Sequence, residues 1–156
     1  MGAMKILWRI SDHVDLEGLG GRKFSSRWTS LGRRVIYLAE SPAGALLEVL
    51  VHFNLDSEDI PGSYTLLQVS APEETAVSHL DSPTEAEWRE VQELTRRIGD
   101  EWLASLKTPL ARVPSAIMPQ TWNYLLNPEH PAASQVRIVE VIKERFDNRL
   151  FRIGPR

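Results

Sequence analysis

The pattern of apolar and polar positions along the chain predicts several short strands and two helices. Short segments rich in β-branched and aromatic residues are typical of β-strands. We expect four such strands, over residues 5–10, 33–39, 64–70 and 135–146. A fifth segment, 111–118, has the composition of a strand interrupted by Pro114, and the turn-forming residues of 122–131 indicate a connection.

The two helices are predicted by different features. Residues 82–106 carry apolar side chains at spacings of three and four, with charged residues between them, as on a helix that buries one face. These apolar residues are Trp88, Val91, Leu94, Ile98, Trp102 and Leu106. A buried helix is expected after Ser41, a good N-cap, because Pro42 suits the first helical position. Strands and helices that mix without strict β-α-β alternation favour an α+β fold.

One carboxylate interrupts the second of these helices. Glu48 stands within the apolar run 43–53, where a charge is costly unless it is paired or functional. Either one edge of the helix is exposed to solvent and Glu48 points along it, or Glu48 is a general base or charge-stabilising group in a cleft that is partly shielded from water. On the helix its side chain shares a face with Gly44, Ala45, Val51 and His52.

Composition and charge narrow the classes of function. At 156 residues the chain suits one domain with a sizeable core. A net charge of −3 gives no basic excess for binding nucleic acid, and no apolar run reaches the roughly 18 residues of a membrane span. The absence of cysteine excludes disulfides, thiol catalysis and cysteine-ligated zinc. We expect a cytoplasmic protein whose single domain runs from Met4 to Arg156, with residues 1–3 a cloning remnant.

Three further residues are candidates for chemistry. Arg27 lies in a glycine-containing segment, 11–34, that is expected to be a long loop. It is either a clamp for phosphate or carboxylate, or an ordinary surface arginine. Tyr37, which alternates with Ile36 and Leu38 on a strand, is either a core residue or a stacking platform. Ser115 follows Pro114, and its hydroxyl alone is a weak indication of ligand binding.

Several familiar chemistries lack their motifs. The four histidines show no metal-ligand spacing such as H-E-x-x-H, so no metal site is predicted. There is no G-x-S-x-G of a serine hydrolase, and GLGG (18–21) lacks the third glycine of a dinucleotide fingerprint. The phosphate loop of nucleotide hydrolases is also missing.

The order of the candidates resembles the RES domain, the toxin of RES–Xre toxin–antitoxin pairs in bacteria. The resemblance rests on RWTSLGRRVIYLAESPAGALLEVLVH (27–52), on VPSAI (113–117) and on NYLLNPEHP (123–131), and it extends from WRI to RFDNRLF. It implies an ADP-ribosyltransferase-like fold, with a mixed or antiparallel sheet and flanking helices. It also implies an enzyme that cleaves NAD at the nicotinamide–ribose bond, with water or phosphate as the acceptor. NAD is then a substrate, and no separate cofactor is expected.

The same resemblance implies roles for individual residues. Glu48 would stabilise the oxocarbenium-like ribose that forms as nicotinamide leaves. Arg27, helped by Arg9, would hold the pyrophosphate or the attacking phosphate. Tyr37 would stack on the nicotinamide, and Ser115 would hydrogen-bond its amide or ribose. A helix-turn-helix antitoxin of the Xre type would cover the site.

Two departures and two alternatives accompany this interpretation. Ser25 and Ser26 stand where the family has glycines, and Thr29 stands where it has asparagine. The alternative enzyme transfers ADP-ribose to a protein. A non-catalytic module that binds a partner peptide in the same groove is the alternative from another class, and it would not need Glu48.

Overall fold

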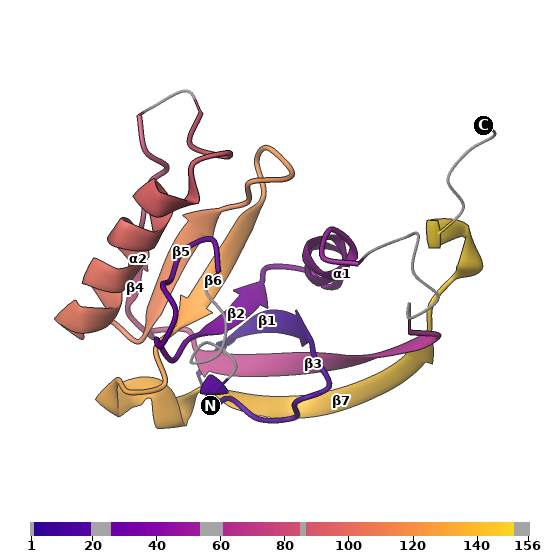
Figure 1. The fold of residues 1–156 in the computed structure, drawn as a ribbon. Helices are drawn as coiled ribbons and strands as arrows, with labels where there is room; N and C mark the ends of the chain where they lie inside the picture. Colours follow the sequence, from indigo (N-terminus) through magenta and orange to yellow (C-terminus); the bar gives the residue numbers. More distant parts are fainter. Residues whose placement is uncertain (1, 20–25, 54–60, 85–86, 152–156) are drawn as a thin grey trace.

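The computed structural model describes residues 2–19, 26–53, 61–84 and 87–151 (Figure 1). Over these residues the chain forms a seven-stranded sheet in the order β4-β5-β6-β2-β1-β3-β7. The strands are β1 (Met4–Ile10), β2 (Ile36–Ala39), β3 (Ser63–Pro72), β4 (Val77–His79), β5 (Leu110–Pro114), β6 (Trp122–Leu126) and β7 (Arg137–Arg145). Only β4 and β5 pair in parallel, and the other neighbours are antiparallel. The predicted α+β fold with a mixed sheet is therefore confirmed.

Two α-helices accompany the sheet. Helix α1 (Pro42–Leu50) follows β2 directly, and α2 (Gln92–Ser105) precedes β5. Figure 1 shows α2 beside β5 and β6, whereas β1, β3 and β7 run together on the other side of the molecule. Strand β2 joins these two halves, so α1 begins where the halves meet. Short 3₁₀ helices, η2 (Pro131–Gln135) and η3 (Asn148–Phe151), flank β7.

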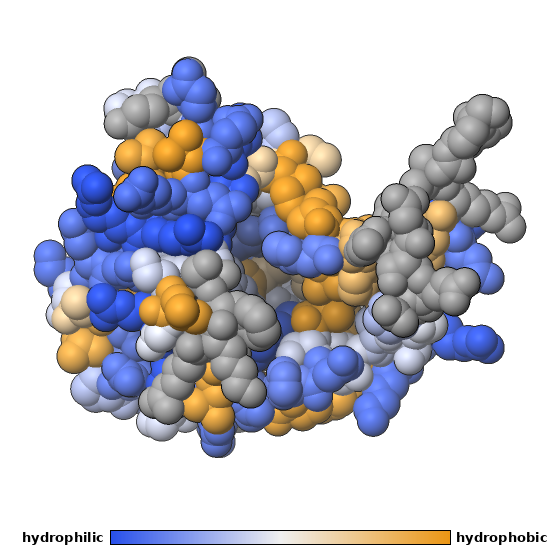
Figure 2. Space-filling model, in the orientation of Figure 1, coloured by the Kyte–Doolittle hydropathy of each residue, from blue (hydrophilic) through white to orange (hydrophobic). Residues whose placement is uncertain are grey.

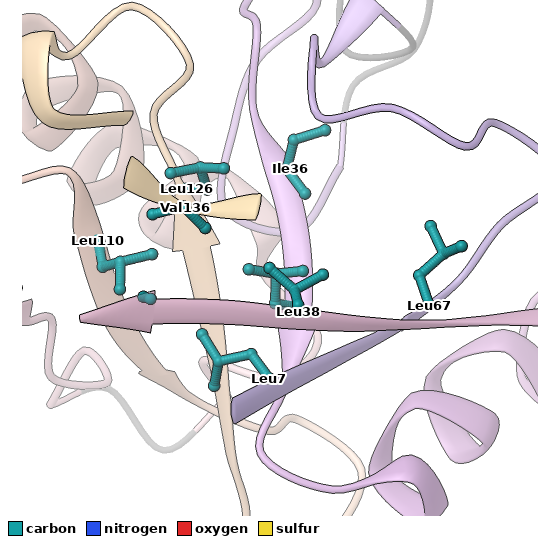
Figure 3. Close-up of a cluster of buried hydrophobic side chains, with 9 residues drawn as sticks. Leu7, Ile36, Leu38, Leu67, Leu110, Leu126 and Val136 are labelled. Carbon is teal, nitrogen blue, oxygen red and sulfur yellow. The ribbon is translucent and has the colours of Figure 1, made fainter. Parts of the chain in front are cut away.

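The two faces of β2 pack into different cores. Ile36 and Leu38 belong to a cluster of aliphatic side chains from β1, β2, β3, β5 and β6 (Figure 3). Val35, with Tyr37 packed beside it, belongs to a second cluster that contains tryptophans of the loop and of α2. The predicted alternation around Tyr37 is therefore confirmed.

Helix α1 starts as the sequence predicts, because the Ser41 hydroxyl accepts a hydrogen bond from the Gly44 amide at 3.0 Å and Pro42 occupies the first turn. The expectation of a buried helix was wrong, since only Gly44 and Ala45 are fully buried. The helix lies at the surface, with its side chains half-buried. Glu48 therefore has access to the space beside the sheet.

Helix α2 is shorter than the predicted 82–106. It begins after Val91, which has no side-chain cap, and it ends because Leu106 adopts a left-handed conformation with φ of 52°. Val91 and Leu106 are exposed, whereas Trp88 reaches the core from a turn and packs against Trp28 with ring centroids 6.4 Å apart. The periodic pattern thus extended past both ends of the real helix.

Two strands were not predicted. Residues 122–126 form β6 between β2 and β5, and only the part from Asn127 onward is a turn. Strand β4 has three residues, too few to give a pattern. The predicted loop 11–34 contains no α-helix or strand in its described parts, 11–19 and 26–34, and Gly20 and Gly21 lie outside the described residues.

Candidate active site

A cavity of about 460 Å³ opens between α1, the strands β1 and β2, the β5–β6 hairpin and the loop that carries Arg27. Its polar lining includes Arg9, Arg27, Tyr37, Glu48, His52 and Asn123, and much of the rest is apolar. This volume falls within the range of small-molecule sites in proteins. The structure therefore brings four of the five predicted site residues to one cavity, and Ser115 lies directly behind it.

Glu48 enters this cavity from α1. Its Oε1 atom accepts hydrogen bonds from the Ser115 hydroxyl at 3.0 Å and from Asn123 Nδ2 at 2.8 Å. In the described part of the chain, no basic side chain forms an ion pair with it. Of the two explanations for this carboxylate, the structure favours a group held in a cleft.

Ser115 is buried, and its hydroxyl is fully engaged. It donates to Glu48 and accepts from the backbone amides of Ile117 and Met118 at 3.1 and 3.2 Å. A hydroxyl has one hydrogen and two lone pairs, so this set leaves nothing for a ligand. Its predicted contact with substrate stays a prediction, and the contacts seen here favour positioning of Glu48 instead.

Arg27 and Arg9 provide positive charge without a carboxylate partner. Arg27 Nη1 donates to the Arg89 carbonyl at 2.8 Å, and Arg9 Nη1 donates to the Asp15 carbonyl at 3.2 Å. Burial lowers the pKa of both guanidiniums, while the charge of Glu48 opposes this for Arg27 and that of Asp15 for Arg9. Among the described residues neither forms an ion pair. Two such groups at one cavity suit a phosphate-bearing ligand.

The loop that carries Arg27 is fixed by α2. The Thr95 hydroxyl donates to the Arg27 carbonyl, and Arg96 Nε donates to the Ser26 carbonyl at 2.7 Å. Asp100 accepts from both the amide and the hydroxyl of Ser30, at 3.0 and 2.6 Å. These contacts satisfy backbone groups of a segment without regular structure, so the position of Arg27 is set by the helix.

Tyr37 links the same loop to β2. Its hydroxyl accepts from the Trp28 amide at 3.1 Å and forms a short hydrogen bond with the Ser26 hydroxyl. Ser26 also bonds the Thr29 hydroxyl at 2.7 Å, so two departures from the family loop form one network with Tyr37. Burial raises the pKa of Tyr37. Tyr37 is among the residues that line the cavity, and its stacking on a ligand stays a prediction. The other departure, Ser25, lies outside the described residues.

Asn123 was missed by the sequence reasoning because its segment was interpreted as a connection. As part of β6 it faces Ala39 and Val113 on the neighbouring strands and also lines the cavity. No local pattern indicated that its amide would meet Glu48, which lies 75 residues away in the sequence.

Two structural features are absent from the described residues. These residues contain no group of three or more acidic or histidine side chains that would hold a metal ion. None of their helices has the length and apolar character needed to cross a membrane.

The sequence matches one known protein family. The profile of the RES domain matches residues 6–148. The chain belongs to the RES-domain family. It is similar to "Toxin Res" of Pseudomonas putida, with 46% identity over 146 residues that cover 94% of this chain and 99% of that protein.

Two further relatives have lower sequence identity to this chain. The chain is 31% identical to "Prs ADP-ribosylating toxin" of a Sphingobium species, over 93% of this chain and 96% of that protein. It is 33% identical to "Toxin Res" of Photorhabdus laumondii, over 79% and 81%. The prediction of a RES-domain toxin is therefore confirmed.

Proposed function

We propose that this RES-domain protein arrests growth by consuming NAD, and that it cleaves the bond between nicotinamide and ribose. The observation that carries the proposal is the placement of Glu48. A carboxylate held by two neutral donors lies at a largely apolar cavity, and two arginines that form no ion pair within the described residues lie at the same cavity. NAD would use both the carboxylate and the arginines. Its pyrophosphate is negatively charged, and its ribose becomes positively charged when nicotinamide leaves.

The chemistry follows from the leaving group. Nicotinamide is cationic while attached to ribose, and it leaves as a neutral molecule with the bonding electrons, so positive charge develops on the sugar. A fixed carboxylate in a water-poor site stabilises that charge by several kcal/mol. Glu48 is the carboxylate placed to do this. Arg27 and Arg9 would hold the pyrophosphate, and the ring of Tyr37 would pack against the nicotinamide.

A second reaction begins with the same bond cleavage. The Sphingobium relative is named as an ADP-ribosylating toxin, which favours transfer of ADP-ribose to a protein side chain. The residues that bind NAD and stabilise the ribose would be the same in both reactions, and only the acceptor would differ. We place cleavage by water or phosphate first and transfer to protein second.

The partner proposed is an antitoxin of the Xre type. Near the cavity, Val51, Ile117 and Met118 expose apolar side chains. On the face shown in Figure 2, hydrophobic residues gather over α1, while the side of α2 is mostly hydrophilic. An exposed apolar rim beside an active site suits a protein that covers it. With NAD of the cytoplasm as substrate, both proteins would act there.

The test is to identify the acceptor. In the first assay, purified protein is mixed with NAD with and without phosphate, and the products are measured by mass spectrometry. In a parallel assay, the protein is mixed with a bacterial lysate and with NAD labelled in its ADP-ribose part. Nicotinamide release without labelled protein supports hydrolysis or phosphorolysis, according to the dependence on phosphate. Labelled protein with no release in the purified sample supports transfer. NAD that stays intact in every sample contradicts both.

A further inference from the structure

We propose that Asn123 is a positioning residue for Glu48, and that Asn123 and Ser115 together direct the other carboxylate oxygen, Oε2, to the reacting ribose. The identity of that substrate rests on the proposed function. Both hydrogen bonds to Glu48 end on Oε1, at 3.0 Å from Ser115 and 2.8 Å from Asn123. Among the described residues, no donor reaches Oε2. Oε1 is therefore held by two hydrogen bonds, and Oε2 is the oxygen that we expect to interact with the substrate.

The two donors come from one rigid unit. Asn123 lies within β6, paired with β2 on one side and β5 on the other, and Ser115 follows the last residue of β5. The Ser115 amide donates to the Thr121 carbonyl at 2.8 Å, which closes the hairpin. Glu48 comes instead from the half-exposed helix α1. The hairpin thus fixes the orientation of a carboxylate that comes from a different, partly exposed element. The orientation of a catalytic group affects the rate more than the affinity.

The amide of Asn123 is arranged for Glu48 at a cost to the fold. Its Oδ1 atom is buried and has no hydrogen-bond partner among the described residues. Turning the amide over would place Oδ1 against Glu48 Oε1, and two acceptors repel each other. A buried acceptor without a partner is unfavourable. The hydrogen bond from Nδ2 to Glu48 is therefore the only favourable polar contact that the Asn123 side chain makes among the described residues.

Asn127 provides a natural comparison. It is buried one position beyond β6, its Nδ2 donates to the Leu103 carbonyl at 3.1 Å and its Oδ1 accepts from the Glu129 amide at 3.1 Å. Both ends of its amide bond to backbone. It is not among the residues that line the cavity. The two asparagines are four positions apart but differ in their partners. Asn127 bonds to backbone groups and stabilises the fold, whereas Asn123 bonds to the Glu48 carboxylate.

The experiment compares Asn123→Ala, Asn123→Leu and Asn127→Ala with the wild-type protein. For each, kcat and KM for nicotinamide release and the melting temperature are measured. We expect both Asn123 variants to lower kcat by roughly tenfold or more with KM changed by less than about threefold, because orientation and not binding is lost. Asn127→Ala is expected to lower the melting temperature and to keep the kcat of the folded protein. Ser115→Ala combined with Asn123→Ala should cost less than the product of the two single effects.

Two results would overturn the inference. One is a wild-type kcat in folded Asn123→Leu, which has nearly the size of asparagine but offers Glu48 no donor. The other is a change in KM alone, which would make Asn123 a substrate-binding residue.

Failure of the proposed function gives a different result, because wild-type protein would then release no nicotinamide. In that case growth arrest on expression, at equal protein abundance, decides the inference. Arrest should be lost with Asn123→Leu and kept with Asn127→Ala, and arrest kept with Asn123→Leu contradicts the positioning role.

Discussion

The backbone of Trp28 lies directly against Gly99 of α2. A methyl group added at Gly99 would stand 1.7 Å from the Trp28 carbonyl oxygen. This close approach lets Thr95 and Arg96 reach the carbonyl groups of the loop that carries Arg27. Arg27 is thus positioned by a helix that contributes little of its own surface to the cavity.

Replacement of Gly99 by alanine should therefore destabilise the protein. We expect the free energy of unfolding to fall by about 1–3 kcal/mol, because the clash is with backbone and outweighs the better helix propensity of alanine. Urea denaturation measures this. Gly62→Ala is the control, since no atom lies within 4 Å of the added methyl group there. Equal stability of Gly99→Ala and wild type would show that α2 and the loop are not closely packed.

Replacement of Arg27 should weaken binding of NAD. Loss of a charged hydrogen bond to phosphate costs about 1.5–3 kcal/mol, so Arg27→Gln is expected to raise KM by roughly ten- to a hundredfold. Arg9→Gln should act in the same direction, because it lines the same cavity. Steady-state kinetics test both, with the exposed Arg137→Gln as control. An unchanged KM in both cavity variants would exclude these arginines from phosphate binding.

The buried phenol of Tyr37 should make stability depend on alkaline pH. Burial raises its pKa, so the folded state holds the proton more tightly than the unfolded state. Its contribution to stability is fully present below the unfolded value near 10 and is lost as the pH rises through the folded value. The stability difference between wild type and Tyr37→Phe should thus shrink between pH 8 and pH values above about 10. A constant difference in urea denaturation over that range would contradict a buried, protonated Tyr37.

Local patterns in the sequence explain which parts of this structure were predictable. The start of α1 needs only Ser41 and Pro42, and strands such as β1 need only a run of apolar residues. The predicted helix began too early because Trp88, in a turn before α2, packs against Trp28, 60 positions away in the sequence. Helical periodicity contains no information about such a distant contact.

The same distinction holds for the site. Glu48 was predicted because a carboxylate in an apolar run is unusual. Arg27 alone was also compatible with an ordinary surface arginine, and the family resemblance gave it a role. Asn123 was missed because its contact is with Glu48, which precedes it by 75 residues. Ser115 was predicted, but its contact with Glu48 appears only when β5 and α1 meet in space.

The most direct test of the account is nicotinamide release from NAD by wild-type protein and by Glu48→Gln. Glutamine keeps the size of the side chain and removes the charge that would stabilise the ribose cation, so we predict a fall in kcat of about a hundredfold or more with the fold retained. The exposed Glu101→Gln serves as the matched control and should behave as wild type. Nicotinamide released at the wild-type rate by folded Glu48→Gln would contradict the central role of this carboxylate.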